Sequence, residues 1–121
     1  MQNLLVIRSD GKNTFEKKSF PSDKAIYLDE FEEIVGGSIE VRELPRLSRK
    51  IKFPVFMVTD EEGLFKDVKL NKPATALFRK FCGISQVFGD VSLCTTDNEK
   101  VTRGFSDDQW RALLSVLMFY I

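Results

Sequence analysis

Hydrophobic and polar residues follow one another along the chain in blocks that predict a mixture of strands and helices. The first block, 4–7, contains four consecutive aliphatic residues, which is typical of a buried strand. Turn-forming residues at 9–13 separate it from a weakly alternating segment, 14–20, which we expect to pair back as a hairpin. Residues 38–44 alternate apolar and charged positions, which indicates a strand with one face in water.

Two more β-rich segments follow in the second half of the chain. Residues 53–59 predict a strand, and the acidic turn 60–63 is expected to connect it to a returning strand, 64–70. Residues 86–95 predict a further strand, after which a short return is expected near 101–102.

Three segments carry apolar residues at helical spacing. The first helix is expected to begin at Asp29, which would form a capping box with Glu32, and to end at Gly36. The second is expected to begin after Asn71 as the cap and to end at Gly83. The third closes the chain.

This closing helix is predicted to start with a capping box made by Ser106 and Gln109. The ten residues 112–121 carry no charge, and their apolar side chains go nearly all round the helix, so we expect burial on most sides. Two uses of the surplus apolar residues stay open: packing in the core of this chain, or contact with a second copy or a partner protein. The residues expected at such an interface are Val116, Phe119, Tyr120 and Ile121.

Together these elements predict an α+β fold with a mostly antiparallel sheet and about three helices, because strands and helices intermix without regular βαβ repetition. The 121 residues contain no linker or repeat, so 1–121 are expected to form a single compact domain. No signal-peptide pattern opens the chain, and its apolar end is shorter than the ~20 residues of a spanning helix. We therefore expect a cytoplasmic protein with both cysteines reduced and no membrane contact.

The inventory of side chains argues against most kinds of catalysis. The chain has no histidine, and its two cysteines lack the further soft ligands of a zinc site. No phosphate-binding glycine motif is present. The carboxylates Asp60, Glu61 and Glu62 are interpreted as solvated charge in a turn. We expect no enzymatic activity, no cofactor and no metal; a carboxylate-dependent enzyme is the less favoured alternative.

Charge gives one local signal. Eighteen basic and eighteen acidic residues balance, so nothing favours a polyanionic partner globally. The segment 46–52, which we expect to be a loop, nevertheless holds four cations in seven residues. It would either follow a phosphate backbone or keep a sheet edge soluble. The candidates for nucleic-acid contact are Arg46, Arg49, Lys50 and Lys52.

A set of landmarks along most of the chain carries a resemblance to a known family. The characteristic stretches are 31–41, 59–63, 70–75, 88–91 and 105–109. Taken together they resemble the small family known only as domain of unknown function 3846, which is found in phages, plasmids and bacteria. The chain departs from the family in a longer middle segment, 45–53, and in its bulkier apolar end.

The resemblance implies a mobile-element setting, with the host cytoplasm as compartment if the protein is phage-encoded, and brings no assigned activity or catalytic residues. Its most characteristic patch is Asn71, Ala74 and Thr75, interpreted either as a helix cap with a tight packing position or as the border of a small-ligand pocket. We therefore expect a non-catalytic accessory protein that binds a host protein or sequesters a small ligand. Counter-defence is the biological role that this setting suggests, and a homodimer is the assembly that we consider. The alternative is a nucleic-acid-binding accessory protein that uses residues 46–52.

Overall fold

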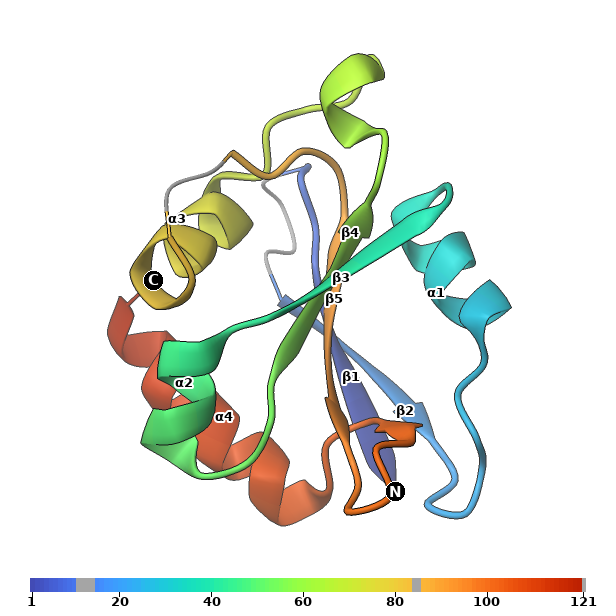
Figure 1. Cartoon of the computed structure of the whole chain (residues 1–121), viewed down its shortest axis with the longest axis vertical. Helices are drawn as coiled ribbons and strands as arrows, with labels where there is room; N and C mark the ends of the chain where they lie inside the picture. Colours follow the sequence, from blue (N-terminus) through green and yellow to red (C-terminus); the bar gives the residue numbers. More distant parts are fainter. Residues whose placement is uncertain (11–14, 84–85, 121) are drawn as a thin grey trace.

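A computed structural model of the chain describes residues 1–10, 15–83 and 86–120. Within these residues it contains six strands, four α-helices and one 3-10 helix (Figure 1). The predicted α+β class is confirmed, and the structure has one α-helix more than the three expected.

All the strands pair in antiparallel fashion, in the order β2-β1-β5-β4-β3, and β6 pairs with the end of β5. The first and fifth strands lie at the centre of the sheet and are almost fully buried. The strands are β1 (Gln2–Ile7), β2 (Phe15–Phe20), β3 (Ile39–Glu43), β4 (Phe56–Asp60), β5 (Val91–Thr96) and β6 (Thr102–Arg103).

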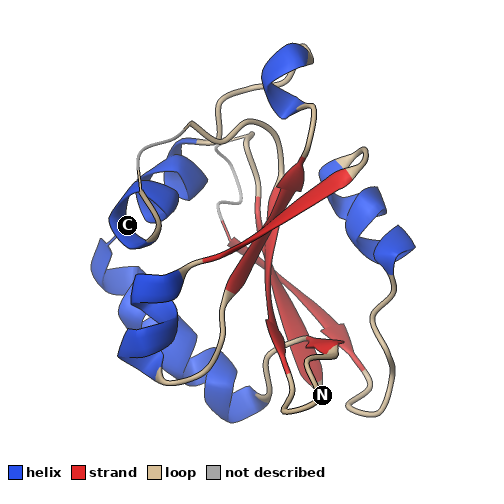
Figure 2. Cartoon of the chain, in the orientation of Figure 1, coloured by secondary structure: helices blue, strands red, loops and turns tan. Residues whose placement is uncertain are grey.

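Helices cover both faces of this sheet, but unequally (Figure 2). The helices are α1 (Leu28–Val35), α2 (Pro45–Ile51), η1 (Gly63–Phe65), α3 (Lys72–Phe81) and α4 (Asp107–Tyr120). Side chains of α2, α3 and α4 form the larger core with Leu5 and Ile7 of β1. Leu4 and Val6 point to the opposite face and form a smaller core with α1. The period of two in β1 therefore divides its side chains between two cores.

The first strand meets the segment that precedes α4 at the sheet. Asn3 of β1 exchanges two backbone hydrogen bonds with Phe105, with N···O distances of 2.7 and 2.6 Å. The neighbouring Gly104 lies so close to Asn3 that a Cβ atom at position 104 would come within 2.8 Å of its backbone. Only glycine fits at this crossing.

The basic segment forms the helix α2 and not the expected loop. Its proline occupies the first turn, where a missing N–H costs nothing, and Leu47 is fully buried in the larger core. The hydroxyl of Ser48 accepts a hydrogen bond from the N–H of Val55 at 2.9 Å. Lys52 ends the helix with a left-handed φ of 69°. A seven-residue helix with one fully buried position shows too little periodicity to be recognised in the sequence.

The returning strand expected at 64–70 is also wrong. After β4 the chain forms η1, and Leu70 makes only an isolated bridge with Phe88. The carboxylate of Asp60 accepts a hydrogen bond from the N–H of Glu62 at 2.9 Å and pairs with Lys66 at 2.7 Å. These contacts turn the chain into η1 and away from a hairpin.

Most of the predicted helix ends are confirmed. Gly36 takes a left-handed φ of 83° after α1, and the side chain of Asn71 accepts a hydrogen bond from the N–H of Ala74 at 3.1 Å. Ser106 and Gln109 form both bonds of the predicted capping box.

The start of α1 differs from the prediction. The helix begins at Leu28, so Asp29 lies inside its first turn. The side chain that accepts the N–H of Tyr27 is that of Glu30, at 3.0 Å.

The closing helix is buried on one side, and not on most sides as expected. Leu113 and Leu117 are buried in the larger core, and Trp110 packs partly against it. Met118 and Phe119 lie on the surface. Over the described part of the chain, no helix reaches the length and apolar character needed to cross a bilayer.

Candidate functional site

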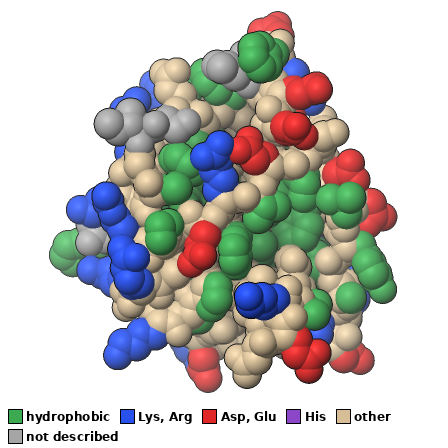
Figure 3. All heavy atoms as spheres, in the orientation of Figure 1, with side chains coloured by type: hydrophobic (Ala, Val, Ile, Leu, Met, Phe, Trp, Pro, Cys, Tyr) green, Lys and Arg blue, Asp and Glu red, His purple; other side chains and the backbone are tan. Residues whose placement is uncertain are grey.

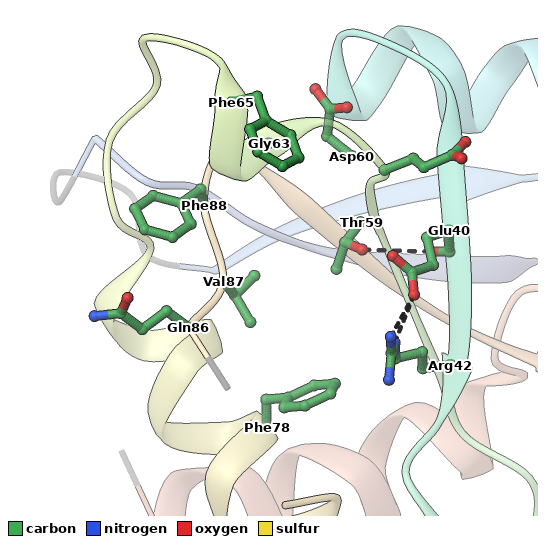
Figure 4. Close-up of a pocket in the computed structure, with 11 residues that line it drawn as sticks. Glu40, Arg42, Thr59, Asp60, Gly63, Phe65, Phe78, Gln86, Val87 and Phe88 are labelled. Carbon is green, nitrogen blue, oxygen red and sulfur yellow. Dashed lines mark hydrogen bonds and ion pairs between the residues drawn. The ribbon is translucent and has the colours of Figure 1, made fainter. Parts of the chain in front are cut away.

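A cleft of about 230 Å³ opens beside the β3–β4 hairpin (Figure 4). Side chains of β3 and β4 form one wall, and η1 with the segment 86–88 forms the other. Phe78 of α3 lies at one end of the cleft, between the two walls. Three parts of the chain that are distant in sequence thus build this one cavity.

The wall made by η1 and residues 86–88 is aromatic. The ring of Phe65 is 86% exposed, and Phe88 is half-buried beside it. An exposed ring next to a cavity offers a flat apolar face on which a planar group stacks.

The wall opposite is polar and charged. The guanidinium of Arg42 donates from Nε to the carboxylate of Glu40 at 2.7 Å, and its Nη2 lies 2.6 Å from the same oxygen. The hydroxyl of Thr59 donates to the backbone oxygen of Glu40 at 3.5 Å. A guanidinium has five N–H groups, so Arg42 keeps donors beyond those that Glu40 accepts.

The acidic turn at the mouth of the cleft is not uniformly solvated, which corrects the expectation for Asp60. Its side chain is only 3% exposed and pairs with Lys66. A Cβ atom on Gly37 would lie 2.4 Å from the Lys66 nitrogen, so this ion pair packs directly against the turn that follows α1. Glu61 and Glu62 are exposed, as predicted. Asp60 thus has a structural partner in Lys66.

The predicted patch Asn71, Ala74 and Thr75 lies inside the molecule. The amide of Asn71 donates to the carbonyl oxygens of Ile7 and Gly89, both at 2.9 Å, and Ala74 is fully buried. These bonds join the end of β1, the start of α3 and the segment before β5. Their geometry is that of a cap and a packing position.

Thr75 contacts the cleft indirectly, through Val87. Its hydroxyl accepts the N–H of Val87 at 2.9 Å and lies 3.3 Å from the carbonyl oxygen of the same residue. Val87 lines the cleft. A ligand-binding role of the patch remains a prediction, and the contact it would act through is the one that positions Val87.

The four basic candidates lie exposed on α2 and at its end, and they are Arg46, Arg49, Lys50 and Lys52. The structure brings the last turn of α3, with Arg79 and Lys80, next to them, because Arg46 Nη1 lies 3.4 Å from the carbonyl oxygen of Lys80. Figure 3 shows Lys and Arg side chains gathered on the side where α2 and α3 lie. Sequence reasoning missed Arg79 and Lys80 because more than twenty residues separate them from α2.

The predicted C-terminal interface residues occupy different environments. Val116 is half-buried and packs against the larger core, whereas Phe119 is 85% exposed. Ile121 and the side chain of Tyr120 lie outside the described part of the chain. Contact of these residues with a partner stays a prediction.

The thiol of Cys94 is buried among apolar side chains of the smaller core. Burial raises the pKa of the Cys94 thiol to about 12, so this sulfur stays protonated at neutral pH. No three Cys, Asp or Glu side chains among the described residues gather closely enough to hold a metal ion. The cleft itself presents aromatic rings on one side and hydrogen-bond donors and acceptors on the other.

Fold and site together define a small α+β domain with one antiparallel sheet and a mixed aromatic and polar cleft. The chain belongs to the family described as "Domain of unknown function (DUF3846)", whose model matches residues 1–117. The resemblance seen in the sequence is thereby confirmed. No curated protein and no solved structure matches the chain.

Proposed function

We propose that this protein is a non-catalytic binding protein that sequesters a small ligand with a planar ring in the cleft beside the β3–β4 hairpin. The observation that carries the proposal is the exposed ring of Phe65, which faces a wall containing Glu40 and Arg42. A planar ligand with polar edges matches both walls at once.

The size of the cleft narrows the class of ligand. Pockets for drug-sized molecules measure roughly 300–1,000 Å³, and this cleft of about 230 Å³ is smaller. A single aromatic ring system such as a nucleobase fits this limit. Its polar edge would meet the donors of Arg42 and the acceptors of Glu40, while its face stacks on Phe65.

Binding without bond-making is supported by the state of the reactive groups near the cleft. Two of the three carboxylates that line the cleft have cationic partners: Asp60 is paired with Lys66, and Glu40 with Arg42. The third, Glu61, is exposed to solvent, which is not the environment that separates the pKa values of a catalytic acid and base.

The setting we propose is that of an accessory protein of a phage or another mobile element, acting in the host cytoplasm, with counter-defence as its role. The family resemblance supports this setting. Capture of a host protein is the alternative form of the same proposal, and the exposed side chains of Tyr27 and Leu28 at the start of α1 support it.

The test is a thermal-shift and calorimetric survey of nucleobases, nucleosides and nucleotides against the wild-type protein and two variants. Phe65→Ala removes the stacking surface and is expected to weaken binding about tenfold, since a base stacked on a ring contributes ~1–3 kcal/mol. Phe119→Ala is the matched control, because it removes an equally exposed ring that does not line the cleft. It should bind like the wild type.

Two results would contradict the proposal. One is a survey in which no compound raises the melting temperature. The other is a bound compound whose affinity is the same in Phe65→Ala as in the wild-type protein. A compound that the protein converts to product would show instead that the site is catalytic.

Nucleic-acid binding is the second candidate, because the structure adds the basic turn of α3 to that of α2. The double variant Arg46→Glu with Arg49→Glu should then lose DNA binding at low salt. Lys69→Glu with Lys100→Glu makes the same charge change at exposed positions on other segments and should not. Fluorescence anisotropy with a short duplex and a short single strand decides, and no binding by the wild type at low salt removes this candidate.

A further inference from the structure

The strand β3 forms an open edge of the sheet. It is last in the strand order, and within the described chain only β4 pairs with it. Bonds at both ends of the β3–β4 ladder fix which backbone groups face β4: Glu61 N–H donates to Ser38, and Leu44 N–H donates to Val55, both at 2.8 Å. Because the backbone N–H and C=O groups of successive residues point to opposite sides of a strand, those of the even-numbered residues of β3 face β4. The outward N–H and C=O groups therefore belong to Ile39, Val41 and Glu43.

This edge lacks the usual protection against pairing. Natural sheets block exposed edges with proline, bulges or a covering segment, and β3 has five residues in regular register without any of these. Val41, at its centre, is 50% exposed. The remaining protective device is charge, carried here by Glu40, Arg42 and Glu43.

We propose that β3 is a self-association surface, on which β3 of a second copy pairs in antiparallel register with Val41 opposite Val41. The two copies are then related by a two-fold axis through this residue pair, and the two sheets join into one. The three outward residues of each strand meet outward residues of the other, so about six backbone hydrogen bonds form.

The charges on β3 are complementary to themselves in this register. Glu40 of one copy lies opposite Arg42 of the other, and the same pair repeats across the axis. Both are non-hydrogen-bonded pairs, in which opposite side chains approach most closely. The charges of Glu40 and Arg42 thus favour pairing with a second copy of this chain over pairing with a strand that is uniformly acidic or basic.

The same charges exclude the neighbouring registers. Sliding one strand by two residues, the smallest shift that keeps outward groups opposite outward groups, places Glu40 opposite Glu40 in one direction and Arg42 opposite Arg42 in the other. Like charges directly opposite each other destabilise a strand pair. Among these registers, only the one centred on Val41 pairs opposite charges.

The other face of β3 adds apolar contact to the same arrangement. Val41 lines an apolar groove of about 230 Å³ together with Leu28 and Phe56. Figure 3 shows hydrophobic side chains exposed between the sheet and α1, where this groove lies. Pairing brings the two Val41 side chains together and joins the grooves of the two copies, so that part of this surface leaves water.

The opposite edge of the sheet, β2, is less well matched at its centre. Self-pairing of β2 centred on Lys17 would also place Glu16 opposite Lys18 twice, but it brings two lysine side chains together where β3 brings two valines together. The centre of the strand therefore favours β3 over β2 for self-association. Self-association through β3 is also distinct from an interface at the end of α4, which contributes nothing to β3.

Charge reversal tests the proposal directly in sedimentation and light-scattering measurements over a concentration series. Arg42→Glu puts Glu opposite Glu twice, and Glu40→Arg puts Arg opposite Arg twice, so each should raise the dimer dissociation constant about tenfold or more. The double variant Glu40→Arg with Arg42→Glu restores both opposite-charge pairs and should dimerise like the wild type. A mixture of the two single variants should form heterodimers. Arg49→Glu on α2 is the charge-matched control and should behave as the wild type.

A backbone substitution gives an independent reading. The N–H of Val41 points away from β4, so Val41→Pro removes an outward donor while leaving the β3–β4 ladder its bonds. It should make the protein monomeric with its circular dichroism unchanged. Val41→Thr keeps the donor and the branched shape and should still dimerise. Comparison of the two separates loss of pairing from loss of folding.

Three outcomes overturn the proposal: a wild-type protein that stays monomeric throughout the series, single charge variants that dimerise like the wild type, or a double variant that fails to recover. Loss of dimer in Phe119→Ala, with the β3 variants unaffected, would place the interface on α4. All these measurements are made without ligand, so they stand or fall separately from the proposed binding function.

Discussion

At the scale of single residues, Asp90 joins two segments that are far apart in the sequence. Its carboxylate accepts hydrogen bonds from the N–H and the hydroxyl of Ser9, at 2.8 and 3.0 Å, and from Arg8 at 3.0 Å. Burial alone raises the pKa of Asp90, but the bonds from Ser9 and Arg8 outweigh it, and the pKa lies below its usual value. The ionised form therefore stabilises the fold.

The sign of the pH dependence follows from this lowered pKa. The stabilisation is fully present above the unfolded value, near 3.8, and is lost as the pH falls through the lower folded value. Asp90→Asn should reduce the free energy of unfolding by about 1–3 kcal/mol at pH 7 and show a weaker loss of stability below pH ~4. Urea titrations at a series of pH values measure both effects. Asp23→Asn, an exposed aspartate in a turn, should change neither; an equal change in both variants would refute the role of Asp90.

At the scale of elements, α4 carries two neighbouring apolar positions with opposite roles. Leu117 is buried in the larger core, and Phe119 two residues later is exposed. Leu117→Ala should cost about 2–5 kcal/mol of unfolding free energy, because it leaves a cavity. Phe119→Ala should stay within about 0.5 kcal/mol of the wild type.

Thermal and denaturant unfolding of the two variants provide the measurement. A chain truncated after Leu114 loses Leu117 as well, and should fail to fold stably. Similar losses for Leu117→Ala and Phe119→Ala would show that the exposed end of α4 packs against something in solution.

The elements also show what the sequence could predict and why the rest escaped it. The strands β1 and β3, and the caps of α3 and α4, depend on patterns of a few adjacent residues, and these predictions hold. The helix α2 was not predicted because its single buried leucine does not produce a helical pattern of apolar residues. The turn into η1 was not predicted because the burial of the Asp60 side chain depends on its ion pair with Lys66, whose position only the folded chain defines.

The cleft escaped prediction for a related reason. Its walls come from β3, η1 and the segment before β5, and no local pattern links them. The predicted patch at Asn71 and Thr75 nevertheless lies directly behind it, since Thr75 holds Val87 of the cleft wall. One predicted residue, Thr75, therefore contacts the wall of the cleft, although the side chains that line the cavity were not among the predicted site residues.

At the scale of the whole molecule, the two cores share the strand β1. The strand β1 sends Leu5 and Ile7 into the larger core and Leu4 and Val6 into the smaller one, so neither core can open without it. We expect a single cooperative unfolding transition. Fluorescence of Trp110, which packs against the larger core, should coincide with far-ultraviolet circular dichroism over the whole denaturant range. A fluorescence transition displaced from the dichroism would show that the cores unfold separately.

The crossing of Gly104 over Asn3 has a consequence for the making of the protein. During synthesis the strand β1 finds one neighbour early, in β2, but its other neighbours are β5 and Phe105, which lie much further along the chain. Such distant partners slow folding, because a long loop must close before any contact rewards it. A nascent chain therefore carries the aliphatic run 4–7 with one edge paired to β2 and the other edge open until β5 and Phe105 have emerged. Chaperones and premature aggregation compete for that open edge in the meantime.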